Sequence, residues 1–297
     1  MIGITFRQLE VFVGAVEAGS LRACADRLAI SQMAVSEHVR SLEKQLGYPL
    51  MDRRRGATAK PTDAGRQAYR QAKQILAGAK ELLSASGPAV ETRQRLRIAA
   101  HGYIAETISK RLTQFASERA DLAVELERRT FEGVLSGLGD GEVDLGFFLS
   151  NGPLPEIDSV LVWREELGFF VGRAHPLAGR PSRTSADLKG LPFIQLPPRS
   201  HLRLQVDSAL AGFGIRDCPV AIVSDDLTMI VENLQGGYSF ACLFASGADE
   251  LIAAGKLERL DLSNAMPLLD VRYAVPPFRR GDPLVADLVG WLAADQP

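Results

Sequence analysis

The apolar residues near the start of the chain recur at helical spacing. A first set, at steps of three and four residues, consists of Phe6, Leu9, Phe12, Val13 and Val16. Thr5 precedes this set in the position of an N-cap. Gly19 is suited to end the helix, and Ser20 to cap a second helix that runs through Leu28. The pattern therefore predicts two short helices joined by a tight turn.

A third helix is predicted to begin after a very short connection. Ser31 is its expected N-cap, and its buried face is expected to hold Val35, Val39, Leu42 and Leu46. Two helices joined this tightly cannot lie parallel, and Ala25 is small enough for Val35 to pack against the second helix. The arrangement is a helix-turn-helix. Its exposed face is expected to hold Gln32, Met33, Ser36, Glu37 and Arg40.

These exposed residues lie at the end of the helix that enters the major groove of DNA in this motif. We expect DNA contacts from Ser31, Gln32, Met33, Ser36, Glu37 and Arg40, and from a basic turn with Arg53, Arg54, Arg55 and Lys60. Adjacent arginines have no packing reason to cluster, whereas they suit a phosphate clamp. The alternative is the solvated face of an ordinary three-helix bundle.

A long, alanine-rich helix is predicted after the basic turn. Thr62 is its expected N-cap, and the apolar stripe comprises Ala64, Ala68, Ala72, Ile75, Ala79 and Leu82 or Leu83. The small N-terminal domain cannot bury this stripe alone, so a second copy of the helix is the natural partner. Packing onto its own chain is the alternative. Residues 84–88 are expected to end the helix at a hinge.

The rest of the chain alternates strand and helix patterns. Strands are expected at residues 96–100, 123–128, 143–149, 161–163, 167–172, 193–195, 221–223, 239–244 and 271–275. Helices are expected at 104–119, 130–140, 201–213, 225–235 and 282–294. This alternation predicts a mostly parallel sheet covered on both faces, and the fold class is therefore α/β overall.

The distribution of charge supports this division. The whole chain has a formal net charge of −2, but residues 1–90 hold 13 Lys and Arg against 8 Asp and Glu. The remainder holds 21 against 28, so its net charge is −7. A basic nucleic-acid module is therefore joined to an acidic domain.

The N-terminal segment resembles the LysR-type transcriptional regulators. The matching positions are Phe6, Leu9, Phe12, Gly19-Ser20, Ala25, Leu28, Ser31-Gln32, Val35-Ser36, Leu42-Glu43, Leu46-Gly47, Leu50, Arg53 and Thr62-Asp63-Ala64-Gly65. Three positions depart from the family pattern: Met33 stands where proline is usual, Glu37 where arginine is frequent and Met51 where phenylalanine is usual. Glu37 places a negative charge on the presumed reading surface, which leaves the base preference open.

The second half resembles the effector domain of the same family, a two-lobed fold like that of periplasmic solute-binding proteins. The segments that match are 141–146, 175–177 and 234–239. The resemblance implies a winged helix-turn-helix domain at 1–61, a dimerisation helix and hinge at 62–94, and an effector-binding domain at 95–297. Lobe I would comprise about 95–164 plus 271–297, and lobe II about 165–270, with a ligand cleft between them.

Carried over position by position, the family pattern nominates cleft residues in both lobes. They are His101, Gly102, Tyr103, Thr130 and Phe148 from lobe I, and Pro198, Arg199, Ser200, His201 and Gly237 from lobe II. The polar members suit an anionic group and the rings an apolar body, so an organic acid is the expected effector. Thr130 as a simple helix cap and Arg199 as a surface charge are the alternatives. Either Phe147 or Phe148 must belong to the core, because adjacent strand residues face opposite ways.

Other chemistry is not indicated. Cys24, Cys218 and Cys242 are widely separated, and the four histidines lack metal-ligand spacing, so no metal site or cofactor is expected. A redox role for Cys218 with Cys242 is the alternative to ordinary packing. No nucleotide-binding, serine-hydrolase or zinc-protease motif is present in the sequence. The N-terminus does not read as a signal peptide, and a cytoplasmic location is expected.

The sequence thus predicts a DNA-binding transcriptional regulator, not an enzyme. The resemblance implies a homodimer or homotetramer that reads an inverted repeat in double-stranded DNA, responds to a small-molecule effector and, as an activator, contacts RNA polymerase. Two other classes of protein are the alternatives. An enzyme acting on a small acid would need a nucleophile, metal or acid–base pair in the cleft. A DNA-compacting protein would carry more positive charge and no acidic domain.

Overall fold

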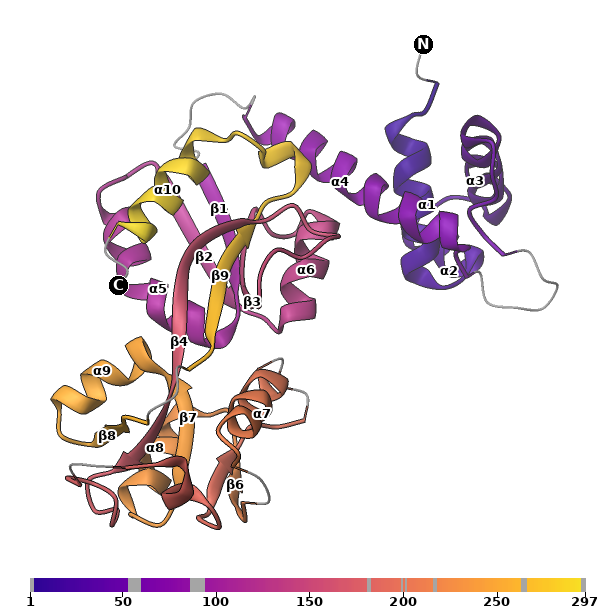
Figure 1. The fold of residues 1–297 in the computed structure, drawn as a ribbon. Helices are drawn as coiled ribbons and strands as arrows, with labels where there is room; N and C mark the ends of the chain where they lie inside the picture. Colours follow the sequence, from indigo (N-terminus) through magenta and orange to yellow (C-terminus); the bar gives the residue numbers. More distant parts are fainter. Residues whose placement is uncertain are drawn as a thin grey trace.

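The computed structural model describes residues 3–52, 60–85, 94–180, 183–198, 200, 202–215, 218–262 and 266–294. A small helical domain lies at the N-terminal end of a long helix, and a two-lobed α/β domain lies at the other end of that helix (Figure 1). Arg53, Arg54, Arg55, Arg199 and His201 fall outside the described residues.

The helical domain consists of α1 (Phe6–Ala18), α2 (Leu21–Leu28) and α3 (Gln32–Leu46). The three predicted N-caps are confirmed, because the hydroxyls of Thr5, Ser20 and Ser31 accept hydrogen bonds from first-turn backbone N–H groups. The predicted apolar stripes meet in one core around Phe12 and Val35, both fully buried. Local spacing and capping therefore account for the whole domain.

A wing begins directly after α3. Met51 pairs with Pro61 in a short antiparallel bridge, and the backbone N–H of Asp52 donates to the carbonyl of Lys60. The buried carboxylate of Glu43 accepts hydrogen bonds from the N–H groups of Leu50 (2.9 Å) and Met51 (3.2 Å). This buried, hydrogen-bonded carboxylate anchors the base of the wing to α3.

The linker helix α4 (Asp63–Ala85) begins where predicted. The hydroxyl of Thr62 accepts from the N–H of Gly65 at 2.9 Å. Gly65 must lack a side chain, because a Cβ there would collide with the carbonyl of Leu50. Ala68 and Ala72 are buried in the core of the helical domain, so the first half of the predicted stripe packs onto its own chain.

The strands of the two-lobed domain form one mixed sheet in the described part of the chain, in the order β2-β1-β3-β9-β4-β7-β5-β6, with β8 paired to β4. They are β1 (Gln94–Ala100), β2 (Leu122–Arg128), β3 (Leu145–Ser150), β4 (Val160–Gly172), β5 (Phe193–Gln195), β6 (Val220–Val223), β7 (Phe240–Phe244), β8 (Leu257–Leu260) and β9 (Leu268–Ala274). The helices are α5 (Gly102–Ser117), α6 (Phe131–Asp140), α7 (Arg203–Gly212), α8 (Leu227–Gln235), α9 (Ala245–Ala253) and α10 (Pro283–Ala293), with 3-10 helices η1 (Ser185–Leu188) and η2 (Pro277–Arg279).

The expectation of a mostly parallel sheet is wrong. The contacts among β1, β2 and β3, and those of β5 with β6 and β7, are parallel, whereas β4 and β9 run antiparallel to their neighbours. These two strands carry the chain between the lobes (Figure 1). β4 pairs with β9 over Val160–Glu166 and with β7 from Leu167 onward, so one continuous strand replaces the two shorter ones that were predicted.

The two faces of the lobe I sheet have separate cores. Ile98 and Phe147 pack with α5 and α10, whereas Ala99 and Phe148 pack under α6. Adjacent residues on each strand thus alternate between the faces, as strand geometry requires. The carboxyl ends of β1 and β2 lead directly into α5 and α6, and these junctions form one wall of the cavity described below.

Candidate functional site

The N-terminal half of α3 presents a polar surface to solvent. Ser31, Gln32, Met33, Glu37 and Arg40 are exposed, and Ser36 is half-buried. Met33 is 79% exposed, which is unusual for a large apolar side chain and leaves it available for contact with a partner. Lys60 is exposed at the base of the wing.

A cavity of about 870 Å³ lies between the lobes. Its walls come from the starts of five helices in the described residues: α5 and α6 from lobe I, and α7, α8 and α9 from lobe II. No side chain of an N-cap residue caps α7 or α9 in the residues that the structure describes. Since a helix N-terminus carries partial positive charge and unsatisfied N–H groups, this convergence favours an anion.

Polar side chains that carry no formal charge also line the cavity. Those of His101, Tyr103, Thr107, Ser200 and Ser246 are half-buried, and that of Thr130 is exposed. The lining carboxylates, which belong to Glu106, Glu132, Asp225, Asp226 and Glu250, are all exposed. Asp226 caps α8, while Glu106 and Glu250 pair with Arg128 and Lys110. Negative charge is therefore concentrated at the rim, and hydroxyl groups and helix N-termini lie inside.

A hydrogen-bonded chain joins the lobes at one side of the cavity. The hydroxyl of Tyr103 on α5 contacts that of Ser246 on α9, and Ser246 donates to Glu165 at 2.7 Å. Trp163 donates to the second oxygen of Glu165, also at 2.7 Å. Because the Ser246 proton goes to Glu165, Tyr103 is the donor to Ser246. Burial, followed by the charge of Glu165, raises the pKa of Tyr103 above its ordinary value, so the phenol keeps its proton.

Two family models together match almost all of the chain. The model described as the bacterial regulatory helix-turn-helix protein of the lysR family matches residues 6–66, and the LysR substrate binding domain matches residues 89–297. The chain belongs to the LysR family of transcriptional regulators. Two predictions from the sequence are thereby confirmed. One is the α/β fold class with an N-terminal helix-turn-helix, and the other is the assignment to DNA-binding regulators with an effector domain.

Relatives of this LysR chain carry names of the same kind. A probable RuBisCO transcriptional regulator of Synechocystis is 31% identical over 71% of the chain, and the match spans 62% of that relative. The HTH-type regulator YeiE of Escherichia coli, described as uncharacterized, is 29% identical over 89% of this chain and 87% of its own. Both are named as transcriptional regulators rather than enzymes.

Solved structures of LysR regulators share the fold. A full-length OxyR variant from Pseudomonas aeruginosa superposes with a TM-score of 0.67 at 21% identity, covering 99% of both chains. Full-length CbnR in complex with its target DNA gives a TM-score of 0.59 at 24% identity, covering 97% of this chain and 98% of that one. At these identities the likeness concerns the fold alone.

The structure brings together some of the cavity residues expected from the LysR pattern. His101, Gly102, Tyr103, Thr130 and Ser200 line the cavity. Thr130 also caps α6 by accepting from Gly133 at 3.1 Å, so its expected alternative role is present as well.

Three nominated residues lie elsewhere. Phe148 is fully buried beneath α6, where its ring meets the edge of Phe131 at a centroid distance of 5.7 Å. Pro198 is exposed and lies outside the lining. Gly237 has a φ of 79° in a turn that packs against Ala174. These assignments to the cavity are wrong. α6 covers the face of β3 that carries Phe148, Pro198 is not part of the lining although its neighbour Ser200 is, and the turn at Gly237 is not part of the lining either.

Other lining residues were not expected from the sequence. Ser246 follows the buried strand β7 in Ala245-Ser246-Gly247, which reads as a loop but starts α9. Arg129 follows a predicted strand and directly precedes Thr130, so its position at a strand end was the available signal. Cys242 also contacts the cavity, and burial raises the pKa of its thiol to about 12, which disfavours a reactive thiolate.

Among the described residues, no group of three or more His, Cys, Asp or Glu side chains is arranged to hold a metal ion. None of the helices among them is both long and apolar enough to cross a lipid bilayer.

Proposed function

We propose that this LysR regulator reads double-stranded DNA as a homodimer or homotetramer, in the cytoplasm, under the control of an organic acid bound between the lobes. The observation that carries the effector class is the convergence of helix N-termini on a cavity whose interior is lined by hydroxyl groups. Contact with RNA polymerase would follow if the regulator is an activator.

The reading residues are proposed to be those on the exposed half of α3. Gln32 suits a bidentate pair with adenine, Arg40 suits guanine or phosphate, and the hydroxyls of Ser31 and Ser36 suit several acceptors. Glu37 is exposed on the same face, where it would accept from the amino group of cytosine. Met33 would contribute an apolar contact, and Lys60, with Arg53, Arg54 and Arg55, would contact phosphates.

Pairing of two chains is supported by the second half of α4. Ile75 is 51% exposed and Leu82 is 70% exposed, seven residues apart and therefore on one face of the helix. Ala79 lies between them on the same stripe. A second copy of α4 would cover this stripe, and a two-fold pair of winged domains would read an inverted repeat.

A mobility-shift titration tests DNA reading. The probe is the intergenic DNA upstream of the chain's own gene, titrated with the wild-type chain, Gln32→Ala and, as a control, Gln45→Ala. Gln45 is exposed on the same helix but lies at its far end. Loss of a bidentate base contact weakens binding by about 1–3 kcal/mol. The reading surface is disproved if Gln32→Ala binds like the wild type across a salt series.

Thermal-shift screening of small carboxylic acids tests the effector class. Gly102 opens onto space at the start of α5, so Gly102→Asp places a fixed carboxylate in the cavity at a helix terminus that favours it. A bound acid at a hundred times its Kd stabilises by about 2.7 kcal/mol. Acids that stabilise the wild type and Gly102→Ala are expected to leave Gly102→Asp unchanged. Equal stabilisation of all three places the acid elsewhere.

A further inference from the structure

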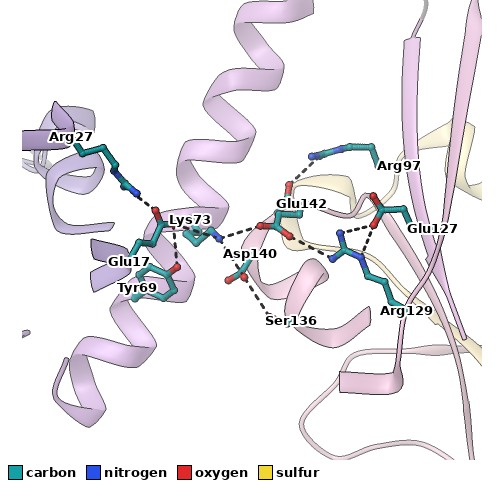
Figure 2. A network of polar contacts seen from close by, with 11 residues as sticks. Glu17, Arg27, Tyr69, Lys73, Arg97, Glu127, Arg129, Ser136, Asp140 and Glu142 are labelled. Atoms are coloured by element: carbon teal, nitrogen blue, oxygen red, sulfur yellow. Dashed lines mark hydrogen bonds and ion pairs between the residues drawn. The ribbon is translucent and has the colours of Figure 1, made fainter. Parts of the chain in front are cut away.

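A cluster of charged side chains lies where the winged domain, the linker helix and lobe I meet (Figure 2). Lys73 of α4 is at its centre. Its Nζ lies 3.3 Å from Asp140 at the end of α6, 3.5 Å from Glu142 just beyond that helix and 3.9 Å from Glu17 of α1. Only 16% of the Lys73 side chain is exposed. Its ammonium therefore bridges the DNA-reading domain and the effector domain.

The winged domain is held to this cluster through Glu17. Its carboxylate pairs with Arg27 of α2 at 2.9 Å and accepts from the hydroxyl of Tyr69 on α4 at 3.3 Å. Three helices thus meet at one carboxylate. Burial disfavours the charged form of Lys73, but Asp140 and its neighbours outweigh this effect and raise the pKa of Lys73, so the ammonium stays charged.

Close packing surrounds the charges on the effector side. Gly141 lies directly against Ala77 of α4, with no room for a Cβ, and Gly78 of α4 faces Phe278 of η2. The linker helix and lobe I are therefore in direct contact next to Lys73. The carboxylates of Asp140 and Glu142 in lobe I therefore lie against α4.

Arg129 extends from the cavity to the same cluster. It lines the cavity beside Thr130, and its side chain then passes over Gly133 and Gly137 of α6, where the absence of side chains leaves a groove. Its guanidinium pairs with Glu127 at 2.7 Å and with Glu142 at 3.5 Å (Figure 2). The carboxylate of Glu142 is therefore shared between Arg129 and Lys73.

We propose that Arg129, Glu142 and Lys73 form an electrostatic relay that couples occupancy of the cavity to the attachment of the winged domain. The proposal rests on the anion-binding function proposed above. An anion in the cavity draws Arg129 toward itself, and Glu142 loses one of its two cations. Glu142 then attracts Lys73 more strongly, at the expense of Glu17, which is the most distant of the three carboxylates around Lys73. The winged domain is loosened.

Hydrogen exchange on the full chain tests the relay without DNA or effector. The readout is the peptide that spans the end of α1 and the start of α2. Arg129→Gln removes the cation that restrains Glu142, and exchange in this peptide is expected to become roughly 2- to 30-fold faster. Lys73→Met is expected to act in the same direction, and the double variant Arg129→Gln with Lys73→Met to match Lys73→Met alone.

One further variant, Glu142→Gln, distinguishes the relay from a general loosening of the structure, because it is expected to change hydrogen exchange in the opposite direction. Glu142→Gln removes the competitor for Lys73, leaves Lys73 to Glu17 and Asp140, and is expected to slow exchange. The matched controls are Lys80→Met, exposed on the same helix, and Arg95→Gln, whose partner Glu125 lies within lobe I. Both controls are expected to exchange like the wild type. High salt is expected to shrink the effects, because Glu142 is half exposed.

Two results would overturn the relay: wild-type exchange in Arg129→Gln, or acceleration by Glu142→Gln. The outcome is distinguishable from failure of the effector proposal. If the variants change hydrogen exchange in the expected directions but no carboxylic acid stabilises the chain, the proposed effector class is wrong and the relay stands. If a stabilising acid leaves exchange near Glu17 unchanged, the relay is wrong and the effector class stands.

Discussion

The winged domain and the interlobe cavity are built in different ways. The proposed reading residues around α3 lie within ten consecutive positions, from the N-cap Ser31 to Arg40, and their arrangement follows from local spacing and three hydroxyl caps. The cavity instead collects the starts of α5, α6, α7, α8 and α9, which lie as far apart in the chain as His101 and Gly247. The proposed reading surface is therefore local in the sequence, whereas the cavity is assembled from segments of both lobes.

The comparison also explains how the two regions are connected. The winged domain has its own core around Phe12, and the effector domain has separate cores around its sheet. Their junction around Lys73 combines ion pairs with the close contacts of Gly141 with Ala77 and of Gly78 with Phe278. Each region therefore has its own core, and the proposed relay acts at the linker helix between them.

Truncation of Phe12 is the largest predicted effect and tests the independence of the two cores. Phe12 is fully buried, and Phe12→Ala is expected to lower the free energy of unfolding of the winged domain by about 3–5 kcal/mol. Phe6 on the same helix is 56% exposed, and Phe6→Ala is expected to change it by less than about 0.5 kcal/mol. Denaturant titration followed by hydrogen exchange should show α1–α3 destabilised and β1–β3 unchanged. Equal loss of protection in both regions would contradict separate cores.

Removal of the Tyr103 hydroxyl tests the contact between the lobes. Tyr103→Phe keeps the ring stacked on Phe244 at 3.9 Å but removes the hydrogen bond to Ser246. The effector domain is expected to lose about 1 kcal/mol of unfolding free energy. Tyr238→Phe is the control, because Tyr238 is 80% exposed and lies outside the cavity. Calorimetric melting of both variants measures the effect, and identical melting temperatures would show that the chain of hydroxyls does not hold the lobes together.

The smallest predicted effect is a pH dependence within lobe II. Burial, and then Arg180, lower the pKa of His175, whose Nδ1 accepts from the N–H of Leu177 at 3.1 Å. The unfolded chain binds a proton below about pH 6.5 while the folded chain resists it, so the free energy of unfolding should fall as the pH drops through that value. The free energy of unfolding stops decreasing once the pH is below the pKa of His175 in the folded state. Denaturation of His175→Gln should be less dependent on pH between about 7.5 and 5.5, and an unchanged dependence would exclude His175 as its source.

The sequence predicted the winged domain nearly completely, because the caps at Thr5, Ser20 and Ser31 act within one turn of the chain. It predicted two strands where β4 is one. Arg164, Glu165 and Glu166 interrupt the apolar pattern there, yet Glu165 is buried as the acceptor of Trp163 and Ser246. A buried hydrogen bond between residues that are distant in the sequence, such as that of Ser246 with Glu165, leaves no periodic pattern in the sequence.

The cavity was predicted only in part, because it is assembled from segments that are distant in the sequence. The resemblance to the LysR family nominated His101, Tyr103 and Thr130, which follow strand ends, and the carboxyl ends of neighbouring parallel strands meet at one edge of a sheet. Phe148 was misplaced because periodicity shows that two faces exist but not which one a helix covers. The directions of β4 and β9 were missed because the alternation of strands and helices was taken to hold along the whole domain. Among the described residues, no helix separates β3 from β4 or β8 from β9.

The most direct measurement of the central claim is the affinity for upstream intergenic DNA with and without an acid identified in the thermal-shift screen, for the wild type and Gly102→Asp. We predict that the acid changes the Kd of the wild-type chain by roughly 5- to 150-fold and leaves that of Gly102→Asp unchanged. An acid that stabilises the wild type through the cavity but leaves its Kd for DNA unaltered would contradict the claim that the cavity controls DNA reading.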